Sequence, residues 1–234
     1  MNIAENVLLL KQDFDKVYEA GKIVGNKKFW DDYQENGARK YCAFLYAGNG
    51  WNNETFKPEH DLQPTNAKSM FQYCHIENYK EHLDSLGRKI DFSQSTNNDG
   101  VFHGCPYLKH LPDIDFSNTH FLVNTFSWSG IETIDSIKIN ERVSFDRTFD
   151  GMPDLKEIRI IGLIRSAIDF GSSPKLSTQS IINIFDALSM MNGSTLTLNK
   201  TAVDNMDFTN TEYDSWEELR ATKSWCWTIV LRNS

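Results

Sequence analysis

A segment of about 23 residues occurs three times in the middle of this chain, with apolar residues at matching positions and different polar residues between them. The copies align on Phe102, Phe126 and Phe149, which stand 24 and 23 residues apart. One such unit cannot bury its apolar edge alone, so the copies must stack into one continuous core. The apolar residues at matching offsets are Leu108, Leu111, Ile114 and Phe116, then Ile131, Ile134, Ile137 and Ile139, then Leu155, Ile158, Ile161 and Leu163.

A fourth, weaker copy precedes these three and begins at Phe71. Its Ile90–Ser93 repeats the pattern of Ile114–Ser117 at a step of 24 residues, but Phe71 and Phe102 are 31 residues apart. We therefore expect an insertion in this copy, forming a helical turn at 79–86. A period of 20–29 residues with one short apolar strand per copy is typical of leucine-rich solenoids. The predicted fold class is α/β, a leucine-rich-repeat solenoid with short parallel strands.

The repeats divide the chain into four predicted segments. Residues 1–28 form an amphipathic helix, 29–66 an aromatic-rich cap and connector, 67–170 the repeats, and 171–234 a C-terminal α/β cap that continues the solenoid. Two interpretations stay open for the first helix: it packs on its own domain, or it joins copies of the chain as a coiled coil into a homo-oligomer. Its apolar seam consists of Ile3, Val7, Leu10, Phe14 and Val17.

Beyond Phe170 the period ends and helices are expected to alternate with strands. The last open edge of a stacked core needs cover, which we assign to Trp225 and Trp227. The expected elements are a helix capped by Ser177 or Thr178 and ended by Gly193, strands at 195–198 and 227–231, and a second helix near 216–222.

The charge and hydropathy of the chain argue against two classes of partner, nucleic acids and membranes. The formal net charge of −8 argues against a nucleic-acid partner, because phosphate needs a basic surface. No apolar run is long enough to span a bilayer, so we expect no membrane insertion. The apolar stretch Val7–Leu10 is too short for a secretion signal, which favours folding in the cytosol.

No motif for chemistry stands out, so we expect no catalytic residue, no metal and no cofactor. His103 and His110 match no ligand spacing and are expected at the surface. Cys74 and Cys105 each follow a repeat phenylalanine by three residues and are expected to pack in the core. A glycosidase pair among the acids between the strands stays open as a third interpretation.

The predicted binding surface is the row of outward-facing strand residues that runs through Asp91, Asp115, Lys138 and Gly162, because stacked strands place such residues side by side. Trp128 stands where other copies have Gly104 and Gly151, so its side chain is expected to project and to add contact energy. The candidate binding residues are Asp91, Tyr107, Asp113, Asp115, Trp128, Ser136 and Lys138.

The repeats resemble a known family. The stretches "MFQYC", "VFHGCPYLKHLPDIDFSN" and "TFDGMPDLKEI" are similar to the bacterial surface-antigen (BspA-like) leucine-rich repeats over about residues 67–170. The cysteine of that pattern is replaced by Ser129 and Met152 in the later copies. The whole layout, with its closing "SWEELRATKSWCWTIVL", also resembles small repeat proteins of phages and prophages of Gram-positive bacteria, labelled tail or virion structural proteins.

The resemblance implies a non-enzymatic, tail-associated virion component that contacts a host-surface protein or glycan through its repeat face. The lack of a secretion signal favours this over a secreted adhesin, because virion parts are made in the host cytoplasm and leave by lysis. The alternative is a cytoplasmic leucine-rich-repeat interaction module, a regulator or effector, that uses the same face on a protein partner.

Overall fold

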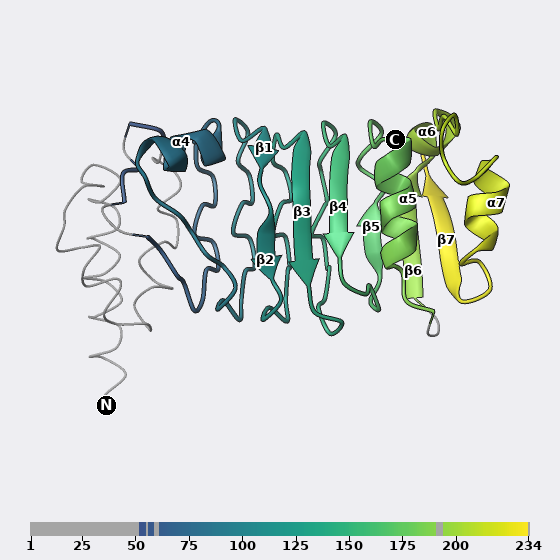
Figure 1. The fold of residues 1–234 in the computed structure, drawn as a ribbon, viewed down its shortest axis with the longest axis horizontal. Coiled ribbons are helices and arrows are strands. Elements are labelled where there is room, and N and C mark those ends of the chain that lie inside the picture. Colours follow the sequence, from purple (N-terminus) through teal and green to yellow (C-terminus); the bar gives the residue numbers. More distant parts are fainter. Residues whose placement is uncertain (1–51, 55, 59–60, 191–193, 234) are drawn as a thin grey trace.

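The computed structural model describes residues 52–54, 56–58, 61–190 and 194–233, and shows an elongated mixed α/β molecule (Figure 1). All strands pair in parallel, which confirms the predicted α/β class with parallel strands. The first sheet consists of β1 (His110–Leu111), β2 (Ile114–Phe116), β3 (Thr133–Ile139) and β4 (Glu157–Ile161). The second consists of β5 (Ile168–Phe170), β6 (Ser194–Asn199) and β7 (Trp227–Arg232).

The register of the first sheet follows the sequence repeat with one slip. Ile114 pairs with Ile137, and Ile137 pairs with Ile160, not with the predicted Ile161. A bulge in β3 places two residues between Ile134 and Ile137 opposite a single residue of β4. A shift of one residue reverses which side chains face the core.

The prediction for the end of the third copy is therefore wrong. Ile160 is buried, whereas Ile161 and Leu163 are 42% and 44% exposed. Ile161 also takes the place beside Lys138 that was expected for Gly162. The other predicted apolar positions of the three copies are all buried.

Five phenylalanines form one stack through the core, which explains why the chain keeps this residue at a fixed place. Neighbouring ring centroids are 5.6, 6.0, 5.6 and 4.5 Å apart, and all five side chains are fully buried. The weak fourth copy contributes its phenylalanine to this stack, and so does β5, the strand that follows the three aligned copies. The members are Phe71, Phe102, Phe126, Phe149 and Phe170.

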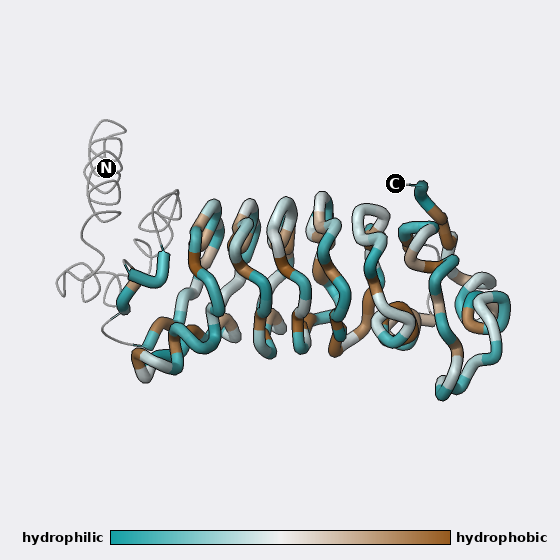
Figure 2. Tube along the Cα trace, turned by 90° about the horizontal axis from the view of Figure 1, so that it is seen from above, coloured by the Kyte–Doolittle hydropathy of each residue, from teal (hydrophilic) through white to brown (hydrophobic). Residues whose placement is uncertain are grey.

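Behind the first sheet the chain returns through four turn-rich segments, 67–74, 98–105, 122–129 and 145–152, which we call the turn wall (Figure 2). Within it, alternate backbone N–H groups donate to carbonyls of the following copy; the Phe102 N–H, for example, donates to the Thr125 carbonyl at 2.8 Å. Two residues of each copy have a positive φ, between 51° and 65°. They are Ser69 and Tyr73, Gly100 and Gly104, Asn124 and Trp128, and Arg147 and Gly151.

The second sheet continues the turn wall, while a helix continues the first sheet. Ser166 and Ser173 donate hydrogen bonds to the carbonyls of Val143 and Met152, which fastens the β5 region onto the last copy of the wall. Helix α5 (Thr178–Ala187) lies beside β4 (Figure 1), and its Ser180 hydroxyl accepts the Ile158 N–H at 2.9 Å.

Most of the predicted elements outside the three copies are present. The insertion is helix α4 (Tyr79–Ser85), Ser177 caps α5, and β6 and β7 lie where strands were expected. The second predicted helix is α7 (Trp216–Ala221), while the short α6 (Lys200–Asp204) was not anticipated.

Two details of the C-terminal cap differ from the prediction. Helix α5 ends at Ala187, well before Gly193. The Ile164 N–H donates to the Ala187 carbonyl at 2.8 Å, and the Ser189 N–H donates to the Ile164 carbonyl at 2.9 Å. These hydrogen bonds replace those that a longer helix would form. Trp227 is buried and donates its indole N–H to the Ser189 carbonyl at 2.8 Å, as cover for the core requires. Trp225, in contrast, is 64% exposed. The predicted N-terminal helix and most of the aromatic cap lie outside the described residues.

Candidate functional site

The predicted row on the first sheet satisfies its own polar groups. The Lys138 ammonium lies 2.8 Å from the Asp115 carboxylate, and the Ser136 hydroxyl donates to Asp113 at 2.5 Å. Ser136 is buried, although it was expected on the outer surface. Asp91 accepts hydrogen bonds from the Gln63 side chain at 3.0 Å and from the Ser93 N–H at 2.9 Å. The polar groups of this row therefore need no ligand to complete their hydrogen bonds.

The upper edge of the same sheet is paired in the same way. Glu132 lies between Lys156, at 2.6 Å, and Lys109, at 3.5 Å. His110 meets Asp135 at 2.9 Å. Exposed pairs of this kind contribute little to stability, but they leave few unpaired charges for a partner on this face.

Two carboxylates of the row, Asp91 and Asp115, have lowered pKa values. The hydrogen bond from the Ser93 N–H lowers the pKa of Asp91. Burial raises the pKa of Asp115, but hydrogen bonds from Lys138 and Ser117 outweigh it and the net pKa is lowered. A lowered carboxyl pKa stabilises the fold above the unfolded-state pKa, and this stabilisation is lost as the pH falls through the folded-state pKa.

Lys138→Met is expected to raise the pKa of Asp115 and to reduce the stabilisation at neutral pH by less than about 1 kcal/mol, because the pair is partly exposed. An NMR titration of the Asp115 carboxyl measures the shift, and urea unfolding at about pH 7 and about pH 3 measures the stability. Lys89→Met, which removes an ammonium without a described ion pair, serves as the control. An unchanged Asp115 titration in Lys138→Met would contradict the assignment.

The turn wall, in contrast, carries two aromatic rings that are open to solvent. Tyr73 is 40% exposed and Trp128 is 65% exposed. A Cβ atom added to Gly104 would lie 2.4 Å from the Tyr73 ring, and one added to Gly151 would lie 2.7–3.0 Å from three ring atoms of Trp128. Glycine in the following copy thus lets each ring lie against the backbone, and the outer side of the ring is left free for contact. The projection expected for Trp128 is confirmed.

His103 fixes the first of these rings. Its Nδ1 lies 2.7 Å from the Ser127 hydroxyl and its Nε2 lies 3.1 Å from the Tyr73 hydroxyl. Ser127 already donates its hydrogen to the Asn124 carbonyl, so Nδ1 carries the proton and Nε2 accepts from Tyr73. Partial burial lowers the pKa of His103 although the Ser127 hydrogen bond opposes it, so the ring is neutral at pH 7.

Two clefts open on the turn wall. The smaller, the Lys68 cleft, has a volume of about 200 Å³ and is lined by Lys68, Ser69, Gln72, Asp99, Gly100, His103, Val123 and Asn124. The larger, the seam cleft, has a volume of about 380 Å³ and lies where the turn wall meets the second sheet. It is lined by Phe145, Asp146, Arg147, Asp150, Ala167, Ile168, Asp169, Thr195, Thr197 and Arg232.

The seven predicted binding residues do not form one site. Tyr107 is 50% exposed and packs edge-on against His75 at 5.2 Å, apart from the row on the sheet. Trp128 belongs to the turn wall. The clefts and the role of Tyr73 were missed, although one signal was present: Tyr73 shares the offset of Gly104 and Trp128 from the repeat phenylalanine.

The remaining candidates for chemistry are accounted for by packing. Cys74 and Cys105 are buried with their sulfurs 3.4 Å apart, and burial raises the pKa of the Cys105 thiol, so the predicted core packing is confirmed. Among the described residues no cluster of His, Cys, Asp or Glu is suited to hold a metal ion. Within the same part of the chain no helix has the length and apolar character to cross a membrane.

Comparison with protein-family profiles, with curated proteins and with solved structures finds no match to this chain.

Proposed function

We propose that this chain is a BspA-like leucine-rich-repeat solenoid and acts as a binding protein whose turn wall contacts a host-surface glycan or protein. The observation that carries the proposal is the pair of exposed rings, Tyr73 and Trp128, each seated against a glycine of the following copy. Rings held in this way lose little conformational freedom on binding, and aromatic anchors of this kind dominate interface energetics.

The paired sheet face supports the same choice of surface. Charges already matched within the chain would have to give up their partners to meet a ligand, and that cost offsets the new contact. The turn wall offers rings and two clefts with fewer internal pairs. We therefore place the binding surface there, and not on the sheet row that the sequence suggested.

The resemblance to phage and prophage repeat proteins supports the further proposal that this binding protein is a tail-associated component of a virion. Mass spectrometry of particles released by the strain that encodes the chain tests this part. Its recovery in purified particles supports a virion component. Its recovery only in the cell lysate favours the alternative, a cytoplasmic interaction module that uses the turn wall on a protein partner.

Trp128→Ala is expected to weaken binding of the full chain to cells of the host strain by about tenfold or more, because the exposed ring face is lost. Stability should change by no more than about 0.5 kcal/mol, since the side chain is mostly exposed. Cell sedimentation with labelled protein measures the binding.

Trp225→Ala is the matched control, because Trp225 is 64% exposed and lies just before β7, the strand of the second sheet farthest from the turn wall. It should leave binding within about twofold of the original. Equal binding by the Trp128→Ala variant and the original chain would contradict a role for the turn wall.

A further inference from the structure

The seam cleft lies where the hydrogen bonding of the turn wall stops. In each earlier copy, alternate N–H groups donate to the next copy; the Asn124, Phe126 and Trp128 N–H groups donate to carbonyls of residues 146, 148 and 150. In the last copy the corresponding donors belong to Arg147, Phe149 and Gly151. None of the described groups accepts a hydrogen bond from these three.

A backbone N–H without an acceptor at this place can donate a hydrogen bond to a bound ligand. Of the three residues, Arg147 is exposed and lines the seam cleft, whereas Phe149 is 1% exposed and, like Gly151, does not line it, so a ligand in the cleft can reach only Arg147. The Lys68 cleft lacks this feature, because the Ser69 and Gly100 N–H groups donate to Asp99 and Val123. The seam cleft therefore has a lining residue, Arg147, whose N–H lacks a described acceptor, whereas Ser69 and Gly100 of the Lys68 cleft have theirs.

The side chains of the seam cleft offer donors and acceptors together. Asp146 and Arg147 are exposed and form no ion pair with a described residue. Asp169 is held by Arg232 at 2.8 Å, and Asp150 accepts the Ser172 hydroxyl at 3.3 Å. Three carboxylates face two guanidinium groups, so the cleft has no excess of positive charge.

We propose that the seam cleft binds a neutral, hydroxyl-rich ligand, a saccharide unit of the host surface. A hydroxyl both donates and accepts, so a sugar satisfies Asp146 and Asp150 as acceptors and Arg147 as a donor. An anion would meet the three carboxylates unfavourably. The volume of about 380 Å³ falls within the range of small-ligand sites.

Trp128 lies next to the cleft, on the preceding copy of the turn wall. Its backbone N–H donates to the Asp150 carbonyl at 2.9 Å, and its ring lies over Gly151. The indole does not line the cleft, so it can stack on a sugar ring only of a ligand that extends beyond the cleft along the turn wall. This inference rests on the proposed function and names the ligand class for one end of the same wall.

The test is calorimetric titration of the full chain with chitotriose, cellotriose and glycerol 3-phosphate. The trisaccharides supply hydroxyls with and without acetamido groups, and glycerol 3-phosphate supplies an anion. We expect at least one trisaccharide to bind and glycerol 3-phosphate not to bind. Failure of both trisaccharides at millimolar concentration, or binding of glycerol 3-phosphate alone, would overturn the assignment.

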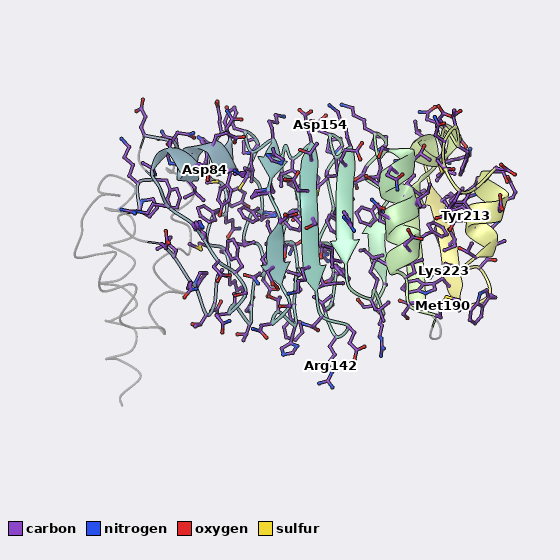
Figure 3. All side chains as sticks on the ribbon, in the orientation of Figure 1. Asp84, Arg142, Asp154, Met190, Tyr213 and Lys223 are labelled. Atoms are coloured by element: carbon purple, nitrogen blue, oxygen red, sulfur yellow. The ribbon has the colours of Figure 1, made fainter. Side chains whose placement is uncertain are left out.

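Variants locate the site. Arg147→Gln and Asp146→Asn are each expected to weaken trisaccharide binding by about tenfold or more. The control, Arg142→Gln at a side chain that points away from the body (Figure 3), should stay within about twofold.

The two proposals fail separately. Trisaccharide binding that is lost in Trp128→Ala but unchanged in both Arg147→Gln and Asp146→Asn would refute the cleft and keep the wall as the binding surface. Loss in Arg147→Gln with unaltered cell binding by Trp128→Ala would keep the cleft and refute the proposed role of the wall.

Discussion

Replacing Phe126 by alanine is expected to lower the free energy of unfolding by about 3–5 kcal/mol, the range for a large aromatic removed from a closed core. Phe126 is fully buried in the middle of the phenylalanine stack, 6.0 Å from the Phe102 ring and 5.6 Å from the Phe149 ring. The first sheet and the turn wall, on either side of the stack, hold the copies apart through their hydrogen bonds, so the cavity left by Phe126 cannot collapse. Urea denaturation followed by circular dichroism measures the change.

Phe121→Ala serves as the control for this prediction. Phe121 lies in the same copy but is 53% exposed, so its removal should cost no more than about 0.5 kcal/mol. A cost below about 1 kcal/mol for Phe126→Ala would show that the stack contributes little to the core.

Gly162→Ala is expected to destabilise the protein by about 2–4 kcal/mol. Gly162 has a φ of +122°, which L-residues rarely adopt, and an added Cβ would lie 2.6 Å from the Ile139 carbonyl oxygen. Both the strain and the collision arise just beyond β4, beside the last residue of β3. The same denaturation measurement applies.

Gly87→Ala separates strain from collision. Gly87 also has a positive φ, +63°, but nothing lies within 4 Å of the added Cβ. Its substitution should cost only about 1 kcal/mol, from backbone strain alone. Equal costs at Gly87 and Gly162 would mean that the contact with Ile139 relaxes freely.

The spacing of apolar residues predicted the core of the repeats. The offsets from Phe102, Phe126 and Phe149 identified most of the buried apolar side chains of the three copies, because burial repeats with the chain's own period. They missed Val101, Leu122, Val143, Phe145, Ile160 and Ile164. The caps and strands beyond Phe170 were predictable for the same local reason: Ser177 as an N-cap and the apolar run of β7 carry their signal within a few residues.

The choice between Ile160 and Ile161 was not local. Both are isoleucines, and only pairing with β3 across its bulge decides which one faces the core. The end of α5 was decided in the same way, because Ile164 takes a carbonyl that a longer helix would have used. Competition from a distant segment leaves no mark in the local sequence.

The features of the candidate site also divide into those that the sequence predicted and those that it did not. The sequence by itself determined the repeat, its phenylalanine stack and the projection of Trp128 at a glycine position. The tertiary structure was needed to show that Asp115 and Lys138 neutralise each other, that Tyr73 lies against Gly104, and that the wall ends in a cleft lined by Asp146 and Arg147. The reason is physical: apolar burial depends on a periodicity within the chain, whereas the pairing of a polar group depends on which group the neighbouring copy places opposite it.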